Sequence, residues 1–274
     1  NPLFDGAAAI AKRGLDGWRA EATAIMRGIF GSVPVAVVKD PRMCQLLDFW
    51  VVVFEQAGYA ADSVFYIHTL RDPVEVALSQ KTRAAANPDF YEIGRDLAEG
   101  AALWLSLTGQ ALGCSGQLNT YYLSYQSLMT ETEAVLLALA NFTGLRPEPH
   151  RVKAFCEGFV DPSLHRSSAG PAERERLESE FPQVLEFARC LQPLLANDEE
   201  QSAALAACSA VFNRTDTREA LSRVATPALS RLSESCRIDR LEAKRSQEVV
   251  NDLERQKVEM AEHAERMRQE HVSV

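Results

Sequence analysis

The ten residues VFYIHTLRDP (Val64–Pro73) decide the fold class that this sequence predicts. They begin with a short apolar run rich in β-branched and aromatic residues, which is typical of a strand buried in a parallel sheet. Arg71 follows the run, and Asp72-Pro73 then supplies a helix N-cap and a first helical residue. The stretch therefore predicts a strand that passes directly into a helix over Val74 to Arg83.

An earlier stretch, VPVAVVKDPR (Val33–Arg42), has the same order of features. Residues 33–38 predict a second buried strand, which is followed by Lys39, by Asp40-Pro41 and by a helix to Gln56. Ligands of parallel sheets bind at the carboxyl ends of the strands, where helix N-termini favour anions. We therefore expect Lys39 and Arg71 to lie at one sheet edge and to bind a ligand with two separated anionic groups. Plain capping of two helices, without a ligand, is the alternative that these residues leave open.

Further elements along the chain alternate in the same way. A third strand is predicted at Thr120 to Leu123. Another helix is predicted to start with the capping box Thr130-x-x-Glu133 and to end near Thr143. The other predicted helices are Asp5–Ile29, Asp96–Leu112 and Pro171–Leu195. Alternating strands and helices indicate an α/β fold with a parallel sheet flanked by helices.

The C-terminal part of the sequence has a different character. We expect one domain over residues 1–196 and a helical region over residues 197–274. From about Thr217 the sequence is rich in charges, with apolar residues at helical spacing. This predicts a long helical tail, either a coiled coil through which the chain forms homo-oligomers or a solvated single helix.

Composition narrows the class of protein. The formal net charge is -9 and the pI is about 5.2, which argues against a nucleic-acid-binding protein because that function needs a basic surface. The six cysteines include no C-x-x-C pair and show no metal-ligand spacing, so we predict no metal site and reduced thiols in a cytoplasmic protein. No apolar run reaches the length of a transmembrane segment.

Several motifs together resemble a known family. The motifs occur in the order KDPR, RDPVEVALSQKTR and YLSYQSL, and the last of them precedes a helix that ends in FTGL. As an ordered set they are similar to motifs of bacterial sulfotransferases that use 3′-phosphoadenosine 5′-phosphosulfate. The resemblance extends from about Val33 to Arg166. It implies a P-loop-like fold and transfer of a sulfuryl group, without a metal, to a hydroxyl or amine of a carbohydrate or small-molecule acceptor.

The resemblance also implies roles for individual residues. Arg71 and Ser79 match the positions that hold the 3′-phosphate of the donor. Lys39 matches the catalytic lysine beside the transferred group, where it would stabilise charge on the bridging oxygen. Tyr125 matches a tyrosine close to the nucleotide, with a core tyrosine as the alternative. Arg42, in the first turn of its predicted helix, either faces the acceptor or pairs with a carboxylate.

One departure from the family pattern limits these expectations. The glycine-rich loop that holds the 5′-phosphosulfate is absent, because no glycine cluster precedes Gly31. We expect this loop and the general base to lie upstream of Asn1, so that the chain binds only the 3′-phosphoadenosine half and is inactive alone. His68 is a weaker candidate for the base. The rival interpretations are a P-loop kinase-like phosphotransferase and a degenerate nucleotide-binding scaffold that assembles through its coiled tail.

Overall fold

The computed structural model describes residues 14–40, 43–87, 93–115, 118–158, 169–197 and 201–234, together with residues 237 and 247. The chain forms two compact units, Asn1–Ala225 and Thr226–Val274. Among the described residues, no helix combines the length and the apolar character that crossing a membrane requires.

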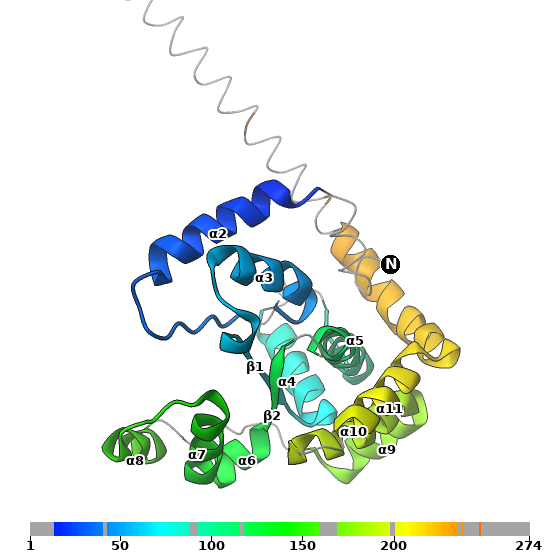
Figure 1. Ribbon diagram of the computed structural model, residues 1–274. Helices are drawn as coiled ribbons and strands as arrows, with labels where there is room; N and C mark the ends of the chain where they lie inside the picture. The colour runs from blue at the N-terminus through cyan, green and yellow to red at the C-terminus, as the bar shows by residue number, and fades with distance from the viewer. Residues whose placement is uncertain are drawn as a thin grey trace, which may run out of the picture. The chain divides into compact units, whose positions relative to one another are not determined.

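The first unit contains a parallel sheet of two strands, β1 (Phe65–Leu70) and β2 (Asn119–Ser124) (Figure 1). Their register pairs Phe65 with Asn119 and Leu70 with Ser124, so both strands end at the same level. Parallel strands require a crossover connection, which here includes helices α4 and α5. The strands predicted around residues 64–67 and 120–123 are therefore confirmed, and the remaining described elements are helical.

The strand predicted at residues 33–38 is wrong. Residues 33–40 form neither helix nor strand, and Val33, Val35 and Val37 are 45%, 52% and 80% exposed. A strand needs a neighbouring strand for its backbone hydrogen bonds, but within the described ranges β1 pairs only with β2. The sheet in this part of the chain is therefore smaller than the P-loop-like sheet that the sequence predicts.

Helices in the first half of the chain lie close to their predicted positions. They are α2 (Asp16–Phe30), α3 (Met43–Ala57), α4 (Pro73–Ala86) and α5 (Leu97–Ser115), with a short 3₁₀-helix η1 (Ala61–Ser63) before β1. Helix α5 packs against both α3 and α4, and α2 packs against α3. The start of the first predicted helix and residues 41–42 lie outside the described residues.

Shorter helices follow β2. They are α6 (Tyr125–Thr130), α7 (Thr132–Thr143), α8 (Pro149–Gly158), α9 (Pro171–Glu180), α10 (Pro182–Leu191), the 3₁₀-helix η3 (Gln192–Ala196) and α11 (Gln201–Asn213). The single helix predicted over residues 171–195 is interrupted at Phe181, because Pro182 has no N–H and disfavours helical geometry in the residue before it.

The capping box predicted at Thr130 is also wrong. Thr130 is the last residue of α6, and its hydroxyl donates a hydrogen bond to the carbonyl of Gln126 (3.1 Å). A cap at Thr130 would start the helix at residue 131, but α7 begins at Thr132. Its N-cap is Glu131, which makes no side-chain capping bond. The predicted end is correct, since Gly144 closes α7 with a φ of 69°, a left-handed conformation that glycine adopts readily.

The two faces of the sheet differ in burial. Leu70 and Tyr122 point into the main core, where they pack with Val74 and Ala77 of α4 and with Leu105 of α5. On the opposite face Phe65 and Ile67 are partly exposed, and the ring of Phe142 in α7 contacts the rings of Phe65 and Tyr121 at centroid distances of 5.4 and 5.2 Å. The α4–α5 layer is therefore the side on which the sheet is anchored.

The side chain of Asn197 forms hydrogen bonds with the outer edge of β2. The Asn197 side-chain amide accepts a hydrogen bond from the backbone N–H of Tyr122 (2.8 Å) and donates one to the Tyr122 carbonyl (2.9 Å). It therefore replaces, at one position, the backbone of a neighbouring strand. Asn197 has a φ of 54°, a left-handed conformation that asparagine tolerates better than most residues.

Replacing Asn197 by alanine is expected to lower the free energy of unfolding by about 2 kcal/mol, because two backbone groups of β2 lose their partner and alanine disfavours the left-handed backbone. Urea denaturation followed by circular dichroism measures this change. Asn197→Gly keeps the backbone conformation and removes only the hydrogen bonds, so it should be less destabilising than Asn197→Ala. Equal stability of Asn197→Ala and the parent chain would contradict this role.

The boundary between the two units lies later than residue 196. Helix α11 belongs to the first unit, since Ala204, Cys208 and Val211 are part of its main core. The second unit begins at Thr226, within a helical stretch over residues 215–234. A helix is confirmed for this part of the predicted tail, whereas the coiled-coil interpretation depends mainly on positions outside the described residues.

Candidate functional site

The corner between β1 and α4 is formed as the sequence predicts. Asp72 is the N-cap of α4, and its Oδ1 accepts hydrogen bonds from the backbone N–H groups of Val74 (2.9 Å) and Glu75 (3.2 Å). Pro73 is the first helical residue, a position whose N–H would have no partner within the helix. The cap fixes where the strand turns into the helix, and so it positions Arg71 at the carboxyl end of β1.

Arg71 meets Tyr125 across the two strands. Leu70 pairs with Ser124 in the parallel register, so the next residues of the two strands, Arg71 and Tyr125, leave the sheet side by side. The Cζ atom of Arg71 lies 4.5 Å from the centroid of the Tyr125 ring, a cation–π contact. Two of the residues that the family resemblance assigns to the nucleotide are therefore brought together at the carboxyl edge of the sheet.

Glu75 holds the guanidinium of Arg71 from the helix side. The Nε atom of Arg71 donates a hydrogen bond to Oε2 of Glu75 at 3.1 Å, and the two side chains are only 23% and 14% exposed. An ion pair in this partly buried setting is screened less than one on the open surface. Arg71 is thus held between a carboxylate and an aromatic ring, and 23% of its side-chain surface is exposed.

A second arginine reaches the same corner from a distant part of the chain. The Nη2 atom of Arg174 in α9 donates to Oδ2 of Asp72 at 2.6 Å. Asp72 therefore caps α4 with one oxygen and binds Arg174 with the other. The corner contains two guanidinium groups and two carboxylates, a balanced set in which an incoming anion would have to compete with Glu75 or Asp72 for the cations.

The other predicted residues are less closely associated with this corner. Ser79 is half-buried in α4, four residues after Glu75 and therefore on the same face of the helix. Lys39 is exposed in the irregular segment 33–40, so it does not lie at the end of a strand as predicted. Arg42 lies outside the described residues. The expected pair of cations at two strand ends is thus reduced to Arg71 alone.

His68 is unsuited to the role of general base. It is only 8% exposed, on the core face of β1, where its ring lies near the rings of Tyr66 and Tyr122. Burial disfavours the charged imidazolium and lowers the pKa of His68 to about 4. Within the described part of the chain, Nδ1 of His68 has no hydrogen-bond partner.

Sequence reasoning missed Glu75 and Arg174. Glu75 had a usable signal, because it lies four residues after Arg71, the spacing at which opposite charges meet along a helix. Arg174 had none, because it is separated from Asp72 by 102 residues and only the tertiary fold brings the two together. Among the described residues, no group of three or more histidine, cysteine, aspartate or glutamate side chains is arranged to hold a metal ion.

Comparison of the chain with models of protein families, with curated proteins and with solved structures yields no match.

Proposed function

We propose that the corner formed by Arg71, Tyr125 and α4 binds the 3′-phosphoadenosine half of a nucleotide sulfuryl donor, and that the chain is part of a sulfotransferase acting on a carbohydrate or small-molecule acceptor. The observation that carries this proposal is the meeting of Arg71 with Tyr125 at the carboxyl ends of two adjacent parallel strands. This edge is where sheets of this kind bind ligands, and an arginine fixed there suits a phosphate with its planar set of donors.

The contacts of Arg71 indicate how a phosphate would enter. Glu75 occupies one side of the guanidinium, and a dianionic phosphate would take over the remaining donors or displace this carboxylate. Ser79, one turn beyond Glu75 on the same face of α4, would then support the same phosphate with its hydroxyl. Tyr125 would keep the guanidinium oriented through its ring face.

Lys39 concerns the transfer step of this proposal rather than the binding of the nucleotide. The reaction would be an in-line displacement that depends mainly on positioning and on charge stabilisation of the leaving oxygen. In this proposal Lys39, which is exposed in the irregular segment 33–40, would supply the positive charge for that oxygen.

Adenosine 3′,5′-bisphosphate, titrated by isothermal calorimetry, tests the proposal. Arg71→Ala is expected to weaken its binding 10- to 100-fold, because a charge-assisted contact to phosphate contributes about 1.5–3 kcal/mol. Glu75→Gln should bind it several-fold more tightly, since the competing negative charge is removed while the size of the side chain is kept.

Arg176→Ala is the matched control, because Arg176 and Glu180 form a comparable i,i+4 ion pair (2.8 Å) on α9. It should leave the affinity unchanged. Adenosine 5′-monophosphate, which has no 3′-phosphate, should bind at least tenfold more weakly than the bisphosphate. Equal binding of the two nucleotides would favour a kinase-like phosphotransferase, and failure of both to bind would favour the scaffold interpretation.

A further inference from the structure

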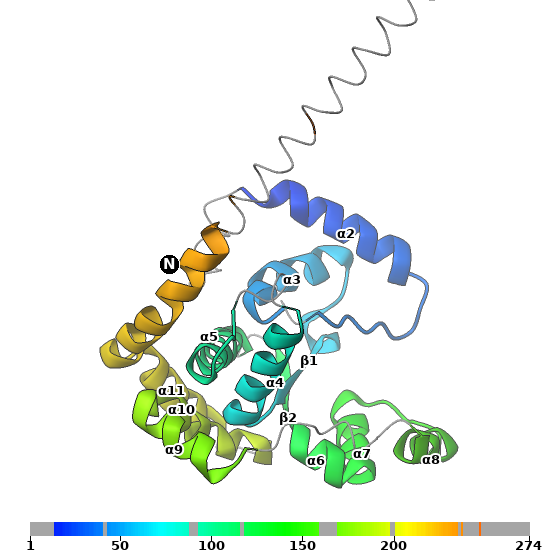
Figure 2. The ribbon, with the colours of Figure 1, turned by 180° about the vertical axis from the view of Figure 1, so that it is seen from behind.

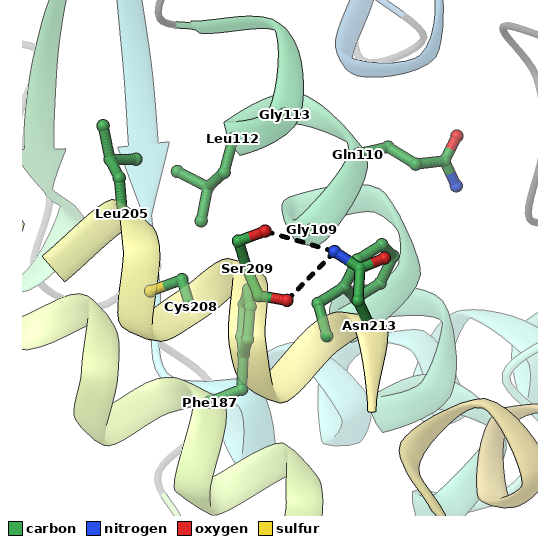
Figure 3. Close-up of a pocket in the computed structure, with 10 residues that line it drawn as sticks. Gly109, Gln110, Leu112, Gly113, Phe187, Leu205, Cys208, Ser209 and Asn213 are labelled. Atoms are coloured by element: carbon green, nitrogen blue, oxygen red, sulfur yellow. Dashed lines mark hydrogen bonds between the residues drawn. The ribbon is translucent and has the colours of Figure 1, made fainter. Parts of the chain in front are cut away.

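Helices α5, α10 and α11 surround a cavity of about 220 Å³ that is separate from the Arg71 corner (Figure 3). Its walls include Leu112 from α5, Phe187 from α10, and Leu205, Cys208 and Phe212 from α11. Phe187 and Cys208 are fully buried members of the main core. The cavity is therefore an opening into the apolar interior of the first unit.

Two glycines one turn apart on α5 line the cavity, and they have different roles. At Gly109 a Cβ atom would lie 2.4 Å from Cδ2 of Phe212, so this glycine is needed to let the aromatic ring approach the helix. At Gly113 a Cβ atom would have no neighbour within 4 Å. Glycine within a helix is destabilising by about 1 kcal/mol relative to alanine, and no close packing requires it at Gly113. Its effect is to leave the cavity unfilled.

The chemistry of the lining excludes a charged ligand. None of the lining residues carries a formal charge. Burial raises the pKa of the Cys208 thiol to about 12, which keeps this part of the wall neutral. A charged ligand would lose its hydration here without gaining a counter-ion.

The polar lining residues form hydrogen bonds with one another and with neighbouring residues. The side-chain amide of Asn213 donates to the carbonyl (3.0 Å) and to the hydroxyl (3.1 Å) of Ser209, as the dashed lines in Figure 3 show. Its amide oxygen accepts a hydrogen bond from Arg218 (2.8 Å), and the amide of Gln110 donates to Ser106 (3.0 Å). These bonds direct the polar groups toward the protein, so the ligand meets mainly apolar and aromatic surface.

The volume sets the size of the ligand. An apolar cavity of about 150 Å³ lined by leucine, isoleucine and phenylalanine stays dry and accepts benzene. At about 220 Å³ this cavity has room for a fused two-ring system. The aromatic walls formed by Phe187 and Phe212 favour a planar ring, which can stack against them or contact their edges.

From these observations we infer that the α5–α10–α11 cavity is a binding site for a small, uncharged aromatic molecule of about two rings. This site does not depend on the function proposed for the Arg71 corner. Indole serves as the probe, because it is planar, uncharged and bicyclic.

Titration of the full chain with indole, followed by isothermal calorimetry and by thermal unfolding, tests the inference. Saturable one-to-one binding is expected, with a melting temperature that rises with indole concentration because the ligand binds only the folded state. Gly113→Leu should fill the space and reduce the affinity at least tenfold. Gly28→Leu is the matched control, since Gly28 is also within a helix and a Cβ there has no neighbour within 4 Å. It should bind indole like the parent chain.

The two glycine variants also locate the bound indole, because Gly113 lines the cavity and Gly28 does not. Absence of saturable binding would overturn the inference, and so would equal affinities of the Gly113→Leu and Gly28→Leu variants.

Discussion

Replacing Gly100 by valine is expected to lower the free energy of unfolding by about 3 kcal/mol, because the added side chain has no room between α4 and α5. A Cβ atom at Gly100 would lie 2.7 Å from the Cα atom and 3.0 Å from the carbonyl oxygen of Ala77. Both contacts involve backbone, so the two helices would have to move apart. Chemical denaturation followed by circular dichroism measures the loss.

Gly113→Val provides the matched control on the same helix. A Cβ atom at Gly113 meets nothing within 4 Å, so the stability of this variant should stay within about 0.5 kcal/mol of the parent chain. Combining Gly100→Val with Ala77→Gly removes the contact with the Ala77 methyl group but leaves those with its backbone, and only partial recovery is expected. Similar stability of Gly100→Val and Gly113→Val would show that the close approach of α4 and α5 does not constrain the fold.

This close contact also concerns the candidate site. Helix α4 carries the Asp72 cap at its start and Glu75 in its first turn, and these two residues hold Arg174 and Arg71. A displaced α4 would therefore move both arginine pairs. We expect Gly100→Val to weaken binding of adenosine 3′,5′-bisphosphate at temperatures where the variant is still folded, even though Gly100 itself lies in α5.

Local sequence signals predicted the corner of the site well. The apolar run, the Asp72-Pro73 pair and the helix that follows depend on interactions within a few residues, and the structure reproduces them in order. The position of Arg71 beside Tyr125 also follows from sequence once two neighbouring parallel strands are assumed. Local capping and strand propensity thus account for the part of the site that was predicted correctly.

Long-range interactions explain the parts that were missed. Residues 33–38 have strand-forming composition, but a strand also needs a hydrogen-bonding partner, and composition carries no information on where that partner comes from. The same reason applies to Arg174 and Asn197, which reach Asp72 and Tyr122 over 102 and 75 residues. A glycine such as Gly100 has no periodic signal at all, since its importance lies in the helix that packs against it.

Acidification from pH 6.5 to pH 4 is expected to destabilise the chain by about 3 kcal/mol through His68 alone. The pKa of His68 is about 4 in the folded state, because its buried ring is kept neutral, and about 6.5 in the unfolded chain. Between these values the unfolded state binds the additional proton, so stability falls as the pH falls and is restored above pH 6.5. Urea denaturation at intervals of half a pH unit measures this slope.

His68→Phe isolates the contribution of the histidine. Phenylalanine suits the aromatic surroundings formed by Tyr66 and Tyr122 and removes the unpaired Nδ1, so stability at pH 7 should be kept while the slope between pH 4 and 6.5 flattens. His150→Gln is the control, because His150 is exposed beside Glu148, and it should retain the parent slope. Below pH 4 all variants should lose stability together, since Arg214 lowers the pKa of Asp216 to about 2 and this carboxylate becomes protonated there. A His68→Phe variant with an unchanged slope would show that another group senses the acid.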